Sequence, residues 1–289
     1  MKKILIGTVA LSAIGLANIA SAADMPLKAP PIIPVVYNWT GCYFGGNIGW
    51  KWGRFHESVD TAGGNAVIPG LGTTAFAADH VDLDGVRTGS GAIGGQVGCR
   101  WENPQHWVFG FEGDFDAMDL HGRVVGRDGT SVLVRGDNFG NRARWESSGR
   151  VIVGRSFNQW LFYATGGIAF TRVTMDANFI PVTVNQIPFP GSAASDSKTL
   201  AGGTIGAGVA YMLSKSWELG AEFRYTAYQK ADFNLGNVAA VCGFTTAVPG
   251  PGPVCVNTGA TGRKDLQTAE ILLKLNYRFD WGGPVVAKY

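Results

Sequence analysis

Three carboxylates at alternate positions, Glu112, Asp114 and Asp116, have a spacing that could support acid–base chemistry. Two carboxyl groups held close together titrate at different pH values, so one can donate a proton while the other accepts one. A β-strand, however, turns every second side chain to the same face, and this alternation alone accounts for the spacing. We therefore assign these acids no catalytic role and predict that the chain is not an enzyme.

Gly89, Gly91 and Gly94 match the glycine spacing of a dinucleotide-binding loop. Such a loop binds pyrophosphate where a strand gives way to a helix, whereas these glycines open a predicted strand. We interpret the match as accidental. Glycine pairs recur along the predicted strands and indicate close backbone approach in a tightly curved sheet. The pairs are 45–46, 94–95, 166–167 and 202–203.

The first residues of the chain predict export. Two lysines, an apolar run over residues 4–19 and small residues at 20–22 are typical of a secretory signal peptide, here residues 1–22. Its removal leaves 22 basic residues, 24 less Lys2 and Lys3, against 22 acidic ones. This balance predicts no nucleic-acid partner. Residues 23–38 contain four prolines and are predicted to form an extended periplasmic segment.

The predicted last strand, Gln267–Phe279, has one apolar face and one polar or charged face. In a transmembrane barrel the apolar face of such a strand contacts lipid and the polar face lines the lumen. A soluble β-sandwich would instead bury the apolar face in its core. The apolar face carries Ile271, Leu273, Leu275, Tyr277 and Phe279, and the other carries Glu270, Lys274, Asn276 and Arg278.

Similar runs predict eight strands in which short turns and long loops alternate. This sorting is typical of outer-membrane barrels, whose turns are short on the periplasmic side and whose loops are long outside. The predicted fold class is therefore all-β: an eight-stranded antiparallel up-and-down transmembrane β-barrel over residues 39–281, followed by a tail at 282–289. The predicted strands are residues 40–52, 89–101, 107–121, 142–156, 160–175, 199–213, 217–229 and 267–279.

Six of the nine tryptophans lie at predicted strand ends beside the short turns or the termini. Indole is amphipathic and prefers the membrane–water interface. We therefore predict a periplasmic aromatic girdle, because a soluble β-domain would scatter its tryptophans over both ends. Its members are Trp39, Trp101, Trp107, Trp160, Trp217 and Trp281.

The predicted lumen carries equal numbers of acidic and basic residues. An eight-stranded barrel is just wide enough to be filled by its own side chains, and buried charges are costly unless they are paired. We therefore predict a paired network that closes the lumen, with a narrow pore for small solutes as the alternative. The predicted network contains Glu112, Asp114, Asp116, Glu146, Arg150, Glu218, Glu222, Arg224, Glu270, Lys274 and Arg278, together with Lys51, Arg100 and Arg144.

The four cysteines fall into two pairs. Cys242 and Cys255 share one long loop and are predicted to form a disulfide in the oxidising compartment to which the chain is exported. Cys42 and Cys99 are expected opposite each other in the first hairpin, because Thr40 is expected to pair with Trp101. They form either a cross-strand disulfide or two lipid-facing thiols.

Two motifs, YNWTGCYFGGNIGWKWG at residues 37–53 and LNYRFDWGGPVVAKY at residues 275–289, resemble the Omp25/Omp31-like porin family of alphaproteobacteria. The resemblance implies a small OmpA-type barrel in the bacterial outer membrane, delivered there by the outer-membrane assembly machinery. Such barrels usually end on the aromatic residue of the last strand. Here ten residues follow Phe279, so either Phe279 or Tyr289 is the expected assembly signal.

The resemblance also frames the functional expectations. The expected role is structural: a monomer, surrounded by lipid and lipopolysaccharide, that maintains the envelope and presents its loops at the surface. Because some members of the family bind haemin, the alternative is haemin or small-ligand binding by the external loops. Its candidate ligands are His56, His80 and His121, whose spacing matches no metal-site motif, and no other cofactor is expected.

Overall fold

The computed structural model forms antiparallel β-strands. Among the described residues, no helix is long and apolar enough to cross a membrane. The predicted signal peptide, Trp281 and the tail at 282–289 lie outside the described residues. The structure describes residues 37–62, 64–68, 72–76, 78–125, 137–184, 187–189, 191–243 and 254–279.

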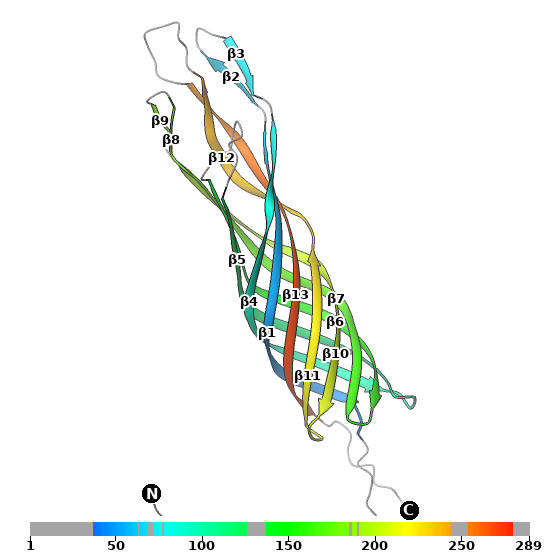
Figure 1. Ribbon diagram of the computed structural model, residues 1–289. Coiled ribbons are helices and arrows are strands. Elements are labelled where there is room, and N and C mark those ends of the chain that lie inside the picture. The colour runs from blue at the N-terminus through cyan, green and yellow to red at the C-terminus, as the bar shows by residue number, and fades with distance from the viewer. Residues whose placement is uncertain are drawn as a thin grey trace, which may run out of the picture. The chain divides into compact units, whose positions relative to one another are not determined.

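Eight long strands close into a ring, because β1 pairs antiparallel with both β4 and β13 (Figure 1). Around the ring the strands follow one another in chain order, so the topology is up-and-down and the predicted eight-stranded barrel is confirmed. The ring strands are β1 (Gly41–Thr61), β4 (Asp79–Glu102), β5 (Trp107–Val125), β6 (Asn138–Phe157), β7 (Trp160–Phe179), β10 (Ser192–Met212), β11 (Trp217–Tyr228) and β13 (Val254–Phe279).

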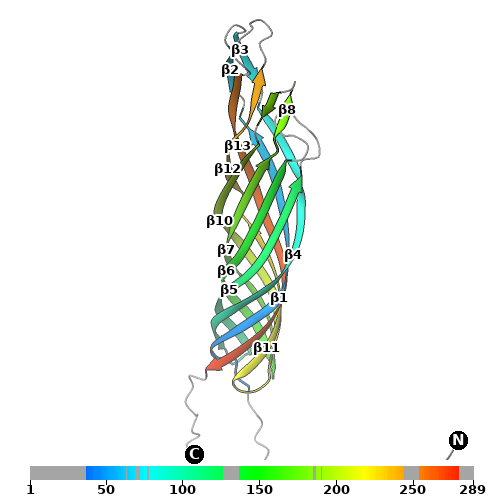
Figure 2. The ribbon, with the colours of Figure 1, turned by 90° about the vertical axis from the view of Figure 1, so that its left-hand side faces the viewer.

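The two ends of the barrel differ in their connections. At one end the turns are short, spanning residues 103–106, 158–159 and 213–216, and His106 and Asn158 adopt the positive φ angles (65° and 54°) that such turns require. At the other end the connections carry additional strands (Figure 2). These are β2 (Gly64–Ile68), β3 (Gly72–Phe76), β8 (Val182–Val184), β9 (Ile187–Phe189) and β12 (Ala231–Gly243).

The lower part of the barrel, next to the short turns, is apolar on its outer surface. Large apolar side chains stand outward on every ring strand, as the alternation predicts for a surface in contact with lipid. We call this surface the lipid-facing band. It includes Phe44, Ile48, Trp52, Ile93, Val97, Phe109, Phe111, Phe115, Val151, Val153, Phe162, Ile168, Ile205, Leu219, Phe223, Ile271, Leu273 and Leu275, which are 41–65% exposed.

Beyond the lipid-facing band the two faces of the strands exchange polarity, so that polar side chains point outward and apolar side chains point inward. On β1 the outward series passes from Trp52 to Arg54 and His56, while the inward residues Phe55 and Val59 are fully buried. The outer part of the barrel therefore has a polar surface and an apolar interior, like a soluble domain. The sequence prediction ended the strands near the band, and this reversal is why: beyond it, the apolar residues stand on the other face.

The outer part also consists of two separate sheets. Within the described residues, the β4–β5 ladder ends at Ala92 and Met118, and the β10–β11 ladder ends at Gly202 and Tyr228. Beyond these points one sheet contains β4, β1, β13 and β12, and the other contains β5, β6, β7 and β10. An apolar core fills the space between them. It includes Phe55, Val59, Leu120, Phe139, Val173, Met175, Phe179, Leu200, Phe233, Leu235 and Leu266.

Candidate functional site in the barrel lumen

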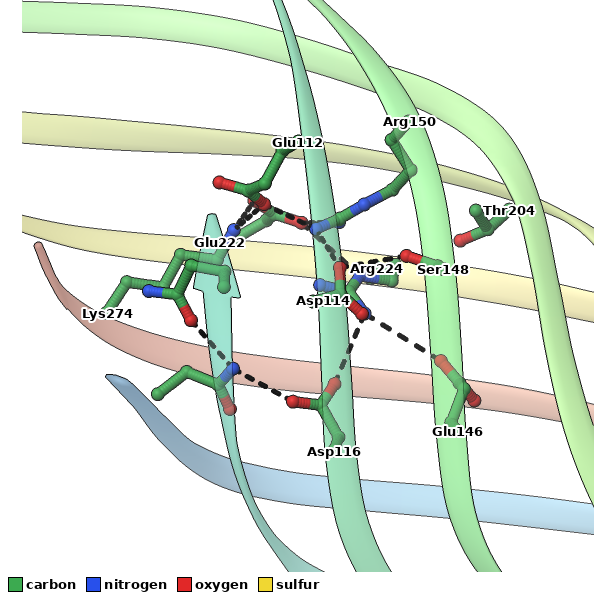
Figure 3. Close-up of polar contacts among 12 residues, drawn as sticks. Glu112, Asp114, Asp116, Glu146, Ser148, Arg150, Thr204, Glu222, Arg224 and Lys274 are labelled. Atoms are coloured by element: carbon green, nitrogen blue, oxygen red, sulfur yellow. Dashed lines mark hydrogen bonds and ion pairs between the residues drawn. The ribbon is translucent and has the colours of Figure 1, made fainter. Parts of the chain in front are cut away.

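The middle of the lumen is filled by charged side chains, and those of β5, β6, β11 and β13 point toward one another in Figure 3. Strand alternation places them there, because each lies on the inward parity of its strand. The structure buries the eleven residues named first in the predicted network, from Glu112 to Arg278, with exposures of 8% or less. Lys51 and Arg100, on β1 and β4, are buried with them.

Arg224 lies at the centre of this network. Its guanidinium is fully buried and contacts four carboxylates from three other strands, β5, β6 and β13, as well as one on its own strand. A single cation therefore compensates much of the negative charge in the middle of the lumen. The N–O distances are 3.0 Å to Glu270, 3.3 Å to Asp114 and Glu222, 3.5 Å to Asp116 and 3.7 Å to Glu146.

Arg150 and Lys274 form a second layer toward the short-turn end. Lys274 Nζ lies 2.6 Å from Glu112 Oε1 and 2.6 Å from Glu222 Oε2. Arg150 pairs with the same two acids and with Asp114. Because Asp114 and Glu222 also contact Arg224, the two layers share carboxylates and form one connected network.

Lys51 closes the network on the side of β1. Its Nζ lies 2.8 Å from Glu146 Oε2 and 3.0 Å from Glu270 Oε2, both of which also contact Arg224. Next to it, Asn47 Nδ2 donates to Asp116 Oδ1 at 2.8 Å. Charged groups in a low-dielectric interior need this kind of multiple pairing to offset their lost hydration.

Two tyrosines extend the network by lying flat across glycines of neighbouring strands. Tyr43 donates its hydroxyl to Glu112 Oε2 at 2.7 Å, and Tyr163 donates to Glu222 Oε2 at 3.0 Å. A Cβ atom at Gly98 would lie 2.6 Å from the Tyr43 ring, and one at Gly208 would lie 2.6 Å from the Tyr163 ring. These glycines therefore provide the space in which the rings pack.

Gly98→Ala is expected to destabilise the barrel by about 1–3 kcal/mol, because the added methyl overpacks a filled site. The new Cβ would also lie 2.7 Å from the Phe111 carbonyl oxygen, so backbone must move. Equilibrium unfolding in urea measures the effect. Gly149→Ala is the matched control, since nothing lies within 4 Å of a Cβ at that glycine. Equal stability of the two variants would contradict the packing described for Tyr43.

Apolar clusters close the lumen on both sides of the charges. Toward the short turns, Trp39 packs with Val108, Ile152 and Leu161, all at most 1% exposed. Between this cluster and the network around Arg224, Arg100 Nη1 donates a hydrogen bond to Glu218 Oε2 at 3.0 Å. On the other side lies the core between the two outer sheets. The charged network thus lies between two apolar clusters, and the Arg100–Glu218 pair lies with the cluster nearer the short turns.

Trp39 corrects the prediction of the aromatic girdle. Its side chain is fully buried, with Arg100 and Arg278 each 5.8 Å from its ring, instead of facing the interface. The reason is that residues 37–40 precede β1, and Gly41, with φ of 145°, separates them from the strand. Four predicted members do stand outward beside the short turns, at 42–51% exposure: Trp101, Trp107, Trp160 and Trp217.

Arg144 corrects the predicted lumen list. The register of β6 shifts between Ala143 and Glu146, so both Arg144 and Trp145 point outward. A β-bulge inserts one extra residue and reverses the inward parity beyond it. The sequence prediction assumed strict alternation along the whole strand, placed Arg144 inward and was wrong at that position.

The three histidines stand outward on separate strands of the outer part. His80 interacts with Asp60 and with Asp82, and hydrogen bonding to Asp60 raises the pKa of this exposed imidazole. The Asp119 carbonyl oxygen accepts a hydrogen bond from His121 Nδ1, 3.1 Å away. The surface pocket beside His56 contains neither of the other two histidines. The structure does not bring the predicted haemin ligands together.

The two cysteine pairs have different outcomes. Cys42 and Cys99 are register partners on β1 and β4 and form a disulfide, which resolves the alternative between a bridge and two thiols. Cys242 and Cys255 are also register partners, on β12 and β13. Their side chains lie outside the described part of the structure, so their disulfide stays a prediction.

One buried charged pair was not predicted from the sequence. Glu57 and Lys264 are buried in the outer apolar core, with Lys264 Nζ 3.5 Å from Glu57 Oε2. Burial beside Phe55 and Phe233 lowers the pKa of Lys264 to about 8, and Glu57 opposes this shift. The signal available was the strand parity of β1, because Glu57 has the same parity as the inward residues Lys51 and Phe55.

Comparisons with known proteins agree with this architecture. Residues 8–279 match the family model of the outer membrane protein beta-barrel domain. The chain is similar to the 31 kDa outer-membrane immunogenic protein of Brucella melitensis biotype 1, with 29% identity over 78% of this chain and 87% of that one. It is also similar to the 25 kDa outer-membrane immunogenic protein of Brucella canis, with 23% identity over 96% and 99%.

Among solved structures, the chain is similar to the outer membrane protein OprG of Pseudomonas aeruginosa. The identity is 11%, the alignment covers 84% of this chain and 98% of that one, and the TM-score is 0.38. A likeness at this score supports no inference about function.

Proposed function

Because this chain belongs to the outer-membrane β-barrel family, in its Omp25/Omp31-like group, we propose that it acts as a closed structural barrel of the outer membrane. The observation that carries this proposal is the filled lumen. Arg224 and its five carboxylates are buried, and apolar layers lie on both sides of them. A water-filled pore would need these charges to be hydrated, whereas here they are paired with one another.

The proposed role is to occupy and stabilise the membrane while holding surface structures in place. The two-sheet outer part supports this role, because its apolar core gives the hairpins at that end a folded base. We propose no catalytic activity. The closely spaced acids Asp114 and Asp116 are both within 3.5 Å of Arg224, which is a structural arrangement.

A deletion strain tests this role. We expect loss of the protein to sensitise cells to detergents and to large hydrophobic antibiotics, because the outer membrane loses a structural component. Uptake of small sugars should remain unchanged. Reduced sugar uptake with intact resistance to detergent would contradict the proposal and favour the narrow porin. Complementation with the wild-type chain controls for effects on neighbouring genes.

Haemin binding by the loops is less well supported. The histidines His56, His80 and His121 lie on three strands, and two carboxylates already engage His80. We therefore place the structural role first.

A further inference from the structure

A surface pocket of about 560 Å³ lies on β6, β7 and β10, on the outside of the barrel. The bulge in β6 creates it, because Arg144 and Trp145 both point outward where strict alternation would turn one of them into the lumen. The residues lining the pocket are Arg142, Arg144, Trp145, Arg172, Thr174, Asp176 and Ser197.

The pocket lies directly beyond the lipid-facing band. Phe115 stacks on Trp145, with ring centroids 5.9 Å apart and an interplanar angle of 17°. Phe170, two residues before Arg172 and therefore on the same face of β7, is 38% exposed. An amphiphile in the membrane would thus meet aromatic rings along its chains and arginines at its head group. This is the level at which the polar groups of membrane lipids lie.

Two arginines of the pocket are available for a ligand. Among the described residues, no carboxylate lies within 4.0 Å of the guanidinium of Arg144 or Arg172, whereas Asp119 holds Arg142 at 2.8 Å. Thr174 and Ser197 add hydroxyl groups, 2.9 Å from each other. Asp176 also lines the pocket, and its Oδ1 accepts a hydrogen bond from Ser195.

Arginine forks match the geometry of phosphate oxygens, and hydroxyl groups commonly complete such sites. We propose that this pocket binds a phosphate group of a glycolipid in the outer leaflet, with Arg144 and Arg172 as the charged contacts. Trp145 and Phe115 contact the acyl chains of the same lipid. The inference rests on the proposed place of the barrel in the outer membrane, and it adds a specific lipid site to that role.

The test compares the wild-type barrel, folded in detergent, with the double variant Arg144→Gln/Arg172→Gln. The probe is bisphosphorylated lipid A, and its Kd is measured by equilibrium titration. We expect the double variant to bind at least about tenfold more weakly, because each lost charge-assisted contact contributes about one decade or more of affinity. Lipid A lacking both phosphates should bind the wild type and the double variant equally.

Arg263→Gln is the matched control. Arg263 is also an exposed basic residue of the outer part, but it lies on the opposite sheet and pairs with Asp232 at 2.9 Å. Equal weakening by this substitution would overturn the proposal, because it would indicate general attraction to a basic rim. Unchanged affinity in the double variant would also overturn it. Full displacement of lipid A by millimolar inorganic phosphate would show that the pocket takes free phosphate and not a lipid head group.

Folding is checked by far-ultraviolet circular dichroism and by the heat-dependent gel shift of the folded barrel. If the double variant does not fold, the single variants Arg144→Gln and Arg172→Gln replace it, with the same expected direction. Failure of the lipid site leaves the conductance of the barrel unchanged. It can therefore be distinguished from failure of the proposed closed-barrel role.

Discussion

Replacing Arg224 with methionine is expected to lower the free energy of unfolding by about 3–5 kcal/mol. Methionine is apolar and fills a similar volume, so the main change is the loss of the cation. The carboxylates of Asp114, Glu222 and Glu270 then remain buried with less positive charge beside them. Breaking a buried ion network from one side leaves uncompensated charge, which costs more than removing the whole network.

Equilibrium unfolding in urea, from lipid vesicles or detergent, measures this effect. Arg155→Met is the matched control, because Arg155 is exposed at the short-turn end and stands over the Trp107 ring at 5.8 Å. Its loss should change stability by no more than about 0.5 kcal/mol. If Arg224→Met were as stable as Arg155→Met, the buried network would not contribute to stability as we describe.

Loss of the Cys42–Cys99 disulfide is expected to have an effect of similar size. The bridge joins residues 57 positions apart, on β1 and β4. Closing a loop of that length restricts the unfolded chain, and the loop-entropy relation gives about 4 kcal/mol. Cys42→Ala/Cys99→Ala should therefore unfold at a lower urea concentration than the wild type.

Reduction of the bridge supplies an independent measurement. In a Cys242→Ala/Cys255→Ala background, unfolding under a strong reductant should give the same midpoint as adding Cys42→Ala/Cys99→Ala. The reductant should not change the midpoint of the resulting variant, which has no cysteine. A second reducible pair, Cys242 and Cys255, is predicted, so Cys242→Ala/Cys255→Ala serves as the control background. If neither the reductant nor the substitutions Cys42→Ala/Cys99→Ala lowered the unfolding midpoint, the bridge would not be stabilising.

Much of the barrel could be predicted because one physical rule governs the residues in the membrane. Lipid contacts one face of each strand, so Ile271 and Leu273 alternate with Glu270 and Lys274, and the ring of eight strands follows. The same rule places the lumen network, because Glu112 and Glu222 are inward on their strands by parity. These charges then pair with one another across the lumen, because a buried charge without a partner is costly.

The errors arose where that rule changes. The bulge in β6 reverses parity between Ala143 and Glu146, and no residue type in the sequence marks it. Trp39 lies outside any strand, so strand-end reasoning did not apply to it. Beyond the band, water replaces lipid and the apolar face turns inward, which is why Phe55 and Val59 lie in a core that the alternation within the membrane did not predict.

Single-channel recording in planar bilayers tests the central claim, the closed lumen, most directly. The purified, refolded barrel should insert without producing stable conductance steps in molar potassium chloride. Insertion is verified independently by protease protection of the bilayer-embedded strands in vesicles of the same lipid. Reproducible unitary steps from the wild type, carried by ions through the space that Arg224, Arg150 and Lys274 occupy, would contradict the account.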